Sequence, residues 1–235
     1  MIGTPKKTFE ILKKHGFTFK KSLGQNFLID ANILNRIVDG AGVNGNVGVI
    51  EIGPGIGSLT EALAKKAKKV ISFEIDGRLL PILSETLADY PNVEIINNDI
   101  LKVDVDKIIA EKMSDCEKIM VVANLPYYIT TPILTHLIEN TEKIDGYVVM
   151  MQKEVANRLN AKVGTKDYNS LTILLNYYTN VEYLFTVPKK VFVPAPNVES
   201  AVVKIMTKET REFETDAKFF KFVRSCFVQR RKTLL

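Results

Sequence analysis

The stretch Val47-Gly-Val-Ile-Glu-Ile-Gly-Pro-Gly-Ile-Gly57 joins a short apolar run to three glycines at alternate positions. The apolar run is shorter than a typical helix and predicts a buried strand. Glycine permits positive φ angles and lets a ligand lie against bare backbone. A helix pattern begins at Ser58, with Leu59 and Leu63 on one face. A strand, a glycine turn and a helix in this order predict a nucleotide-binding turn at the carboxyl end of a strand.

The glycines do not have the spacing that is typical of NAD-binding folds. The dinucleotide fingerprint, Gly-x-Gly-x-x-Gly, would require a glycine where this chain has Ser58. A nicotinamide dehydrogenase is therefore an alternative that the spacing disfavours. The turn alone is a weak motif, so the ligand has to be predicted from the side chains at the ends of the strands that follow.

Three further apolar runs follow, and each ends in a polar side chain, at Glu74, Asp99 and Asn124. Counted from Glu51, these positions are 23, 25 and 25 residues apart, which allows one strand and one helix each. The ends of successive parallel strands line one edge of a sheet, where open α/β folds bind ligands. We therefore expect Glu74 to suit a ribose diol and Asp99 to suit an adenine amino group.

The rest of the chain predicts three more strands, over residues 146–151, 181–187 and 200–206. The segment between the last two contains three prolines, so it cannot be a crossover helix and the final strand should run antiparallel to its neighbour. We therefore predict an α/β, Rossmann-like fold. It would have a mostly parallel seven-stranded sheet, an antiparallel last strand and helices on both faces.

The composition is that of an ordinary globular protein. Of 235 residues, 46% are hydrophobic and 25% are charged, which supports a sizeable core. No apolar run reaches the roughly 18 residues of a membrane span, and the lysine-rich start lacks the apolar segment of a secretory signal. The two cysteines, Cys116 and Cys226, and the two histidines, His15 and His136, have no metal-ligand spacing. We expect a cytoplasmic protein with free thiols, no membrane association and no metal.

The two ends of the chain are basic and its centre is acidic. Residues 1–21 carry a net charge of +5, residues 217–235 carry +6, and the remainder carries −6. Solvated basic helices are a common cause of such charge runs. With a nucleotide site between them, however, the basic ends favour a polyanion such as RNA. The candidate RNA-binding residues are Lys20, Lys21, Arg224, Arg230, Arg231 and Lys232.

The stretch Asn124-Leu-Pro-Tyr127 combines an amide, a backbone carbonyl and an aromatic ring in one turn. Pro126 and the β-branched residues after Tyr127 disfavour an immediate helix. The ring can stack on a flipped-out base, while the amide and carbonyl oxygens accept from an exocyclic NH₂ group. Such turns are common, so the prediction depends on its register with the glycine turn and the two carboxylates.

These motifs together resemble the signature of S-adenosylmethionine-dependent RNA adenine-N6 methyltransferases. The resemblance extends to Lys20-Lys-Ser-Leu-Gly-Gln-Asn-Phe-Leu28, to Phe192-Val-Pro-Ala-Pro-Asn-Val-Glu-Ser-Ala-Val202 and to Arg230-Arg-Lys-Thr-Leu. It is closest to the branch that dimethylates 16S ribosomal RNA. Leu125 and the run from residue 194 to 202 favour this branch over its sister, which methylates large-subunit RNA and gives macrolide resistance.

The resemblance implies S-adenosylmethionine as the cofactor and a role for each motif residue. The N-terminal motif would close over the methionine end, Glu74 would bind the ribose and Asp99 the adenine. Asn124 and the Leu125 carbonyl would hold the target N6, with the base between Tyr127 and Phe192. The implied cofactor residues are Gln25, Asn26, Leu28, Glu51, Gly53, Gly55, Gly57, Glu74, Ile75, Asp99, Ile100 and Asn124, and the implied catalytic residues are Asn124, Leu125, Pro126, Tyr127 and Phe192.

The resemblance also implies domains and a partner. Residues 1–208 would form the catalytic domain, with residues 1–45 as its basic, cofactor-closing segment. Residues 209–235 would begin a helical RNA-binding domain that continues further in the family, so we expect a truncated chain. The expected partner of this monomer is 16S ribosomal RNA, in the small subunit or its precursor, modified at adjacent adenosines in a hairpin loop near the 3′ end. A large-subunit methyltransferase and a mainly non-catalytic ribosome-assembly factor remain alternatives.

Overall fold

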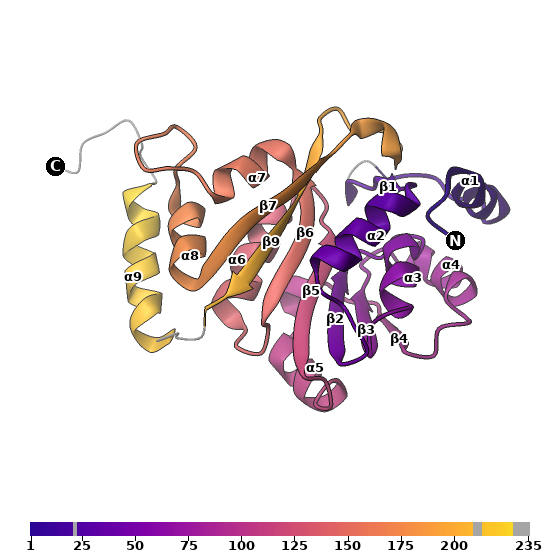
Figure 1. Ribbon diagram of the computed structural model, residues 1–235, viewed down its shortest axis with the longest axis horizontal. Coiled ribbons are helices and arrows are strands. Elements are labelled where there is room, and N and C mark those ends of the chain that lie inside the picture. Colours follow the sequence, from indigo (N-terminus) through magenta and orange to yellow (C-terminus); the bar gives the residue numbers. More distant parts are fainter. Residues whose placement is uncertain (21–22, 209–212, 228–235) are drawn as a thin grey trace.

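The computed structural model describes residues 1–20, 23–208 and 213–227. Its centre is a seven-stranded sheet with the strand order β4-β3-β2-β5-β6-β9-β7 (Figure 1). The first five strands in this order pair in parallel. The predicted Rossmann-like α/β fold is therefore confirmed. The strands are β2 (Val47–Ile52), β3 (Lys69–Phe73), β4 (Val93–Ile96), β5 (Lys118–Asn124), β6 (Gly146–Gln152), β7 (Thr179–Val187) and β9 (Ser200–Thr207).

Helices pack against both faces of this sheet. Val49 of β2 clusters with residues of α2 and α3, whereas its neighbour Ile50 clusters with residues of α5 and α6. Alternate residues of a strand point to opposite faces, so a continuous apolar run is buried on both. The helices are α1 (Pro5–Lys14), α2 (Ala31–Gly40), α3 (Ser58–Ala64), α4 (Leu80–Thr86), α5 (Val105–Lys112), α6 (Thr130–Asn140), α7 (Lys153–Leu159), α8 (Ser170–Tyr178) and α9 (Phe213–Cys226), with short 3₁₀ turns η2 (Gly77–Leu79), η3 (Ile100–Lys102) and η4 (Lys189–Val191).

Two elements show how local sequence positions the site. The strand β2 is the apolar run predicted before Gly53, and all six of its residues are buried. Asp30 caps α2, because its carboxylate accepts hydrogen bonds from the backbone N–H groups of Asn32 at 2.9 Å and Ile33 at 3.1 Å. This cap fixes the point at which the N-terminal segment becomes helical.

The strand β9 runs antiparallel, as the prolines before it predicted, but it lies between β6 and β7. The sequence did not predict this position. In the ladders, Asn124 is level with Met150 near the end of β6, and Gln152 of β6 pairs with Ser200 at the start of β9. The start of β9 therefore lies at the edge where the parallel strands end.

The N-terminal segment is held against that edge. Phe27 and Leu28 form a short strand, β1 (Phe27–Leu28), which pairs with β8 (Phe192–Val193). We predicted no strand at either place. Phe27 also belongs to a small apolar cluster with Leu12 of α1 and Leu83 of α4. Two segments far apart in sequence are thus brought together beside the glycine turn.

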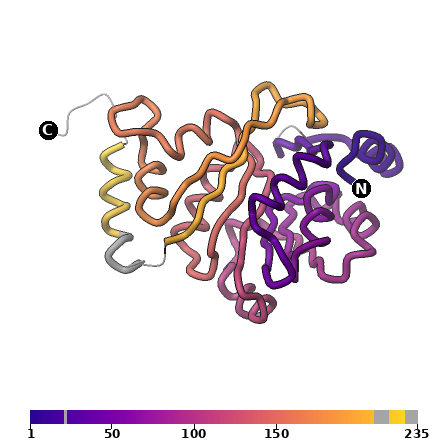
Figure 2. Tube along the Cα trace, viewed as in Figure 1, coloured from indigo at the N-terminus to yellow at the C-terminus, as the bar shows by residue number. Residues whose placement is uncertain are grey.

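The two ends of the described chain lie far apart. Figure 2 shows α1 and α9 at opposite ends of the long axis of the molecule. Phe220 and Val223 of α9 belong to the large core cluster, and the ring centroid of Phe220 is 5.2 Å from that of Tyr178 in α8. Among the described residues, no helix is both long enough and apolar enough to cross a membrane.

Candidate functional site

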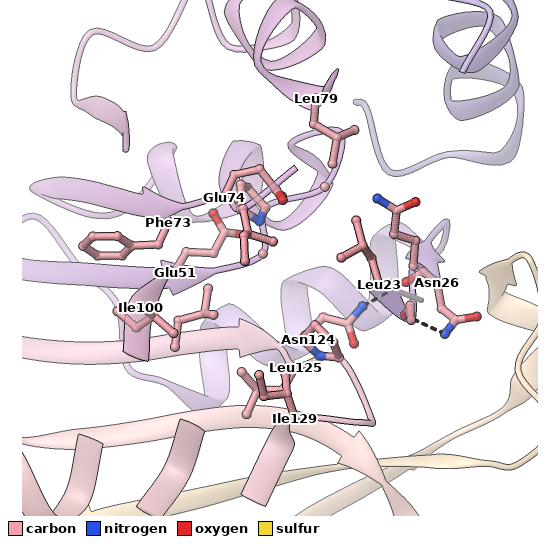
Figure 3. Close-up of a pocket in the computed structure, with 18 of the residues that line it drawn as sticks. Leu23, Asn26, Glu51, Phe73, Glu74, Leu79, Ile100, Asn124, Leu125 and Ile129 are labelled. Atoms are coloured by element: carbon pink, nitrogen blue, oxygen red, sulfur yellow. Dashed lines mark hydrogen bonds between the residues drawn. The ribbon is translucent and has the colours of Figure 1, made fainter. Parts of the chain in front are cut away.

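A pocket opens at the edge where β2, β3, β4 and β5 end (Figure 3). Residues 23–28, called the N-terminal wall below, close one side of it. Gly57 and Phe192 do not line the pocket. The predicted residues that do are Gln25, Asn26, Leu28, Glu51, Gly53, Gly55, Glu74, Ile75, Asp99, Ile100, Asn124, Leu125, Pro126 and Tyr127.

The glycine turn leaves open backbone at Gly53. This residue has φ +70°, and a Cβ atom built on it would meet no atom within 4 Å, so a ligand can lie against the backbone there. Gly57 has a different role from the predicted contact. Its φ of +92° forms the N-cap of α3, and a Cβ atom would meet Leu87 at 3.2 Å. Gly57 therefore sets the backbone conformation of the turn but does not line the pocket.

Glu51 is completely buried, and only one of its carboxylate oxygens has a partner. The hydroxyl groups of Thr60 and Ser72 both donate to Oε2 at 2.7 Å, whereas Oε1 has no protein partner. Burial raises the pKa of this carboxyl to about 7. A buried oxygen without a donor is costly, so Oε1 at the pocket suits a ligand that brings a donor, such as an ammonium group.

Glu74 is the second buried carboxylate in the pocket, 5% exposed. The backbone N–H of Asp76 donates to its Oε1 at 2.8 Å, and burial raises the pKa of the carboxyl to about 7. Ile75, next to it, is 56% exposed and presents an apolar side chain in the pocket wall. The pair combines an acceptor for hydroxyl groups with a surface for a flat ring.

Asp99 is placed by the turn that follows β4. Its carboxylate accepts from the backbone N–H of Leu101 at 3.1 Å and so caps η3. Asn98, which the sequence analysis missed, lies beside it in the pocket wall and accepts from the backbone N–H of Asp99 at 2.8 Å. The half-exposed Asp99 carboxylate can accept a further hydrogen bond from a ligand.

Asn124, at the end of β5, contacts the N-terminal wall directly. Its Nδ2 atom donates to the backbone carbonyl of Asn26 at 3.0 Å, a contact drawn in Figure 3. Because the opposite orientation would set two acceptors against each other, this bond fixes which atom of the amide is the donor. The Oδ1 atom is then available as an acceptor.

The turn after Asn124 is held from three sides. The backbone N–H of Leu125 donates to the backbone carbonyl of Met150 in β6 at 3.0 Å. The hydroxyl of Thr130 donates to the backbone carbonyl of Pro126 at 3.0 Å. The hydroxyl of Tyr127 lies 2.6 Å from that of Ser200, at the start of β9. The predicted turn is therefore rigid, with a half-buried tyrosine at the pocket wall.

Phe192 does not face the pocket. It is 2% exposed and packs in a core cluster with Leu28 and Val187, and β8 pairs it with Leu28 across the two-stranded sheet. A stacking role would require the ring to leave this packing. That role stays a prediction.

The N-terminal wall is fastened by residues that the sequence analysis did not single out. Gln25 accepts from the backbone N–H of Lys20 at 2.9 Å and donates to the Asp76 carboxylate at 2.9 Å. The guanidinium of Arg78 donates twice to Asp76, at 2.9 and 2.6 Å, and lowers the pKa of that carboxyl to about 2. Asp76 therefore connects the wall to the loop that carries Glu74.

The two candidate RNA-binding residues that the structure describes lie on different parts of the fold. Lys20 is exposed beside the N-terminal wall. Arg224 lies on α9 and pairs with Glu139 at 2.5 Å. In the described part of the chain, no cluster of three or more histidine, cysteine or acidic residues could hold a metal. Lys21, Arg230, Arg231 and Lys232 lie outside the described residues.

Comparisons with known proteins show which family the chain belongs to. The family model for ribosomal RNA adenine dimethylases matches residues 16–235. The ribosomal RNA small subunit methyltransferase A of Staphylococcus haemolyticus is 60% identical over 99% of this chain and 79% of its own length. The protein of the same name from Bacillus pumilus is 60% identical over 100% of this chain and 81% of its own length.

Crystal structures of related enzymes have the same fold. A dimethyladenosine transferase from Plasmodium falciparum is 32% identical, with a TM-score of 0.74 over 88% of this chain and 72% of that chain. The 23S rRNA methyltransferase ErmE is 28% identical, with a TM-score of 0.68 over 88% of this chain and 80% of that chain. The predicted resemblance is therefore confirmed, and the chain belongs to the ribosomal RNA adenine dimethylase family.

Proposed function

We propose that this chain transfers methyl groups from S-adenosylmethionine to the N6 atoms of adenosines in 16S ribosomal RNA. The names of the 60% identical relatives support the small ribosomal subunit as the source of the substrate. The observation that carries the proposal is the fixed amide of Asn124, whose Nδ2 atom is bonded to Asn26 and whose Oδ1 atom is left to accept. An adenine N6 amino group needs such an acceptor.

The pocket residues fit the cofactor in chemistry and position. The unpartnered Oε1 of Glu51 and the open backbone at Gly53 would hold the methionine end, while Glu74 would accept from the ribose hydroxyls. Ile75, Ile100 and the carboxylate of Asp99 would bind the adenine. When bound, S-adenosylmethionine supplies a methyl group that its sulfonium has already activated.

The catalytic turn would act on the target base. The N6 lone pair of adenine is delocalised into the ring, so it is a poor nucleophile. Hydrogen bonds from both N6 protons to Asn124 Oδ1 and to the Leu125 carbonyl favour a pyramidal nitrogen and stabilise the positive charge that develops on it. Tyr127 would stack on the base, and in-line positioning supplies most of the remaining acceleration.

We further propose that residues 1–208 are the catalytic domain and that residues 209–235 begin a helical RNA-binding domain of a monomeric enzyme. The resemblance of residues 230–234 to the start of that domain supports this division, and α9 packs on α8 at the large core cluster. A large-subunit methyltransferase is the second candidate, since ErmE is 28% identical. Relatives at 60% identity support the small subunit more strongly.

The test is methyl transfer to small ribosomal subunits that lack the modification, with mass-spectrometric mapping of dimethyladenosine in their RNA. Replacing Asn124 with alanine should lower kcat about 100-fold or more, as loss of one stabilising group does in other enzymes. Asn140→Ala, which changes an asparagine at the far end of α6, is the control and should keep full activity. Large ribosomal subunits that lack the modification are assayed in parallel, and methylation of their 23S RNA with none of the 16S RNA would overturn the choice of substrate.

A further inference from the structure

Ser200 is a fully buried residue with its hydroxyl 2.6 Å from that of Tyr127. Either hydroxyl can donate in this bond. The two residues are 73 positions apart, so only the tertiary fold brings them together. No function considered above uses Ser200, although it contacts a residue of the catalytic turn.

The backbone of Ser200 is held more firmly than that of Tyr127. It begins β9, where it pairs with Gln152 of β6 on one side and with Val187 of β7 on the other. Tyr127, in contrast, lies in the turn between β5 and α6. The bond therefore connects a side chain on a loop to a fixed point of the sheet.

Two side-chain torsions orient a tyrosine ring, and a rigid backbone turn does not by itself select one combination of them. A short hydrogen bond from the ring hydroxyl to a fixed atom restricts both. Stacking on a base requires one ring plane, and a ring already held there loses less entropy when the base arrives.

We infer that Ser200 is a positioning residue that holds the Tyr127 ring in the plane required for stacking on the target adenine. This inference rests on the proposed function of the Asn124–Tyr127 turn. It assigns a role to the late segment of the chain that does not depend on whether Phe192 reaches the base.

The first test is a double-mutant cycle of Ser200→Ala and Tyr127→Phe, measured as kcat/KM for methyl transfer. Each single variant should lose about 3- to 10-fold, the value of one hydrogen bond. The double variant should lose no more than either single one, because both changes remove the same bond. Ser200→Thr, which keeps the hydroxyl, should restore most of the activity. Affinity for S-adenosylhomocysteine should stay within twofold throughout.

The control is Thr207→Val, which removes a hydroxyl bonded to the carbonyl of Ile144 at the other end of β9. Thr207→Val should lower Tm about as much as Ser200→Ala does, but it should leave kcat/KM unchanged. If the loss of activity in the double variant equals the product of the two single losses, the two residues act independently. Ser200 would then act through the strand, and the inference would be wrong.

A second measurement separates this inference from the proposed function. In ligand-free protein with ¹³C-labelled tyrosine, Ser200→Ala should sharpen and shift the Tyr127 ring signals, as expected for a freed ring. If wild-type protein fails to methylate RNA while Ser200→Ala still changes the ring signals, the proposed function is contradicted and the positioning contact is kept. Unchanged ring signals in Ser200→Ala would overturn the inference itself.

Discussion

Asn124 donates its side-chain amide to the backbone carbonyl of Asn26 at 3.0 Å, across 98 residues of sequence. The bond joins the turn of residues 124–127 to the N-terminal wall of the pocket. The placement of the wall therefore has two effects. It closes one side of the pocket, and it holds the Asn124 amide so that Oδ1 is left as an acceptor. Residues that fasten the wall should affect both cofactor binding and catalysis.

Gln25→Ala tests this coupling. The substitution removes the bonds from Gln25 to Asp76 and to the backbone of Lys20, each at 2.9 Å. We expect affinity for S-adenosylhomocysteine to fall by about 0.5–1.5 kcal/mol, mainly through faster dissociation. Stopped-flow measurement of the dissociation rate checks this. Asp76→Asn should have at least as large an effect, because it also weakens the pairing with Arg78. The double variant should lose less than the sum of the two, since both changes affect the Gln25–Asp76 bond. Unaltered dissociation in both variants would show that the wall is held by other contacts.

Glu74→Ala tests the ribose site. The buried carboxylate is proposed to accept from the ribose hydroxyls, so its loss should weaken S-adenosylhomocysteine binding by about 1.5–3 kcal/mol. Isothermal calorimetry provides the measurement. Glu85→Ala is the control, because Glu85 lies outside the pocket and pairs with Lys14. Equal affinities of Glu74→Ala and wild type would refute the ribose role.

The two buried carboxyls predict an unusual dependence of stability on pH. Burial raises the pKa of both Glu51 and Glu74 from 4.5 to about 7 in the folded protein. Between these values the folded chain holds protons that the unfolded chain has lost. Their contribution to the free energy of unfolding is therefore complete below pH 4.5 and falls, by up to about 3 kcal/mol for each group, as the pH rises to 7.

Denaturant unfolding of the ligand-free protein at pH 5 and pH 7.5 checks this expectation. Glu51→Gln, which stays neutral, should lose less stability between the two values than wild type does. Glu85→Gln should not reduce the loss, because Lys14 lowers the pKa of Glu85 and its titration lies at more acidic pH. Asp76 acts in the opposite sense: its pKa of about 2 means that its contribution is lost only as the pH falls below 3.8. An equal loss of unfolding free energy between pH 5 and pH 7.5 in Glu51→Gln and wild type would show that Glu51 does not cause the pH dependence.

Phe192→Leu separates packing from stacking. Phe192 is 2% exposed, so truncation to alanine would leave a cavity and lower stability by about 3–5 kcal/mol. Leucine keeps most of the apolar volume, and we expect it to lower stability by about 1.5 kcal/mol or less. If the ring stacks on the base, methyl transfer should still fall several-fold while S-adenosylhomocysteine affinity stays constant. Full activity of Phe192→Leu would show that this residue only packs.

Those parts of the molecule set by local pattern were predictable from the sequence. The apolar run before Gly53 could only be a buried strand, and the carboxyl end of each parallel strand had to meet the same edge. Glu51, Glu74, Asp99 and Asn124 therefore come together as expected.

Features that depend on contacts between distant segments were not predictable. A two-residue strand such as β1 has no periodicity to detect, and its pairing with β8 is decided by packing of the whole fold. Asp76 and Arg78 follow Glu74 with no pattern of their own, and Gln25, which bonds to Asp76, lies 51 residues before it. The burial of Phe192 likewise follows from that pairing, because it places the ring among residues of β1 and β7.

Lys20 and Lys21 remain the strongest candidates for contacts with RNA phosphates. Lys20 is exposed beside the pocket, whereas Arg224 is paired with Glu139 on a helix at the other end of the long axis (Figure 1). Each cation on a phosphate releases counterions, and on single strands one contact changes the slope of log K against log salt by about 0.7. The Lys20→Ala, Lys21→Ala double variant should therefore weaken RNA binding and flatten this slope by about 1.4, which is twice the value of one contact.

Arg224→Ala is the matched control for the lysine pair. It removes a cation of α9 that is already paired with Glu139, at the opposite end of the long axis from α1, so affinity and slope should both stay near the wild-type values. Affinities for a 16S RNA hairpin, measured by fluorescence anisotropy at four salt concentrations, give both quantities. If Arg224→Ala flattens the slope and the lysine variant does not, RNA is held at the α9 end. The N-terminal lysines would then be solvated charges, as such runs commonly are.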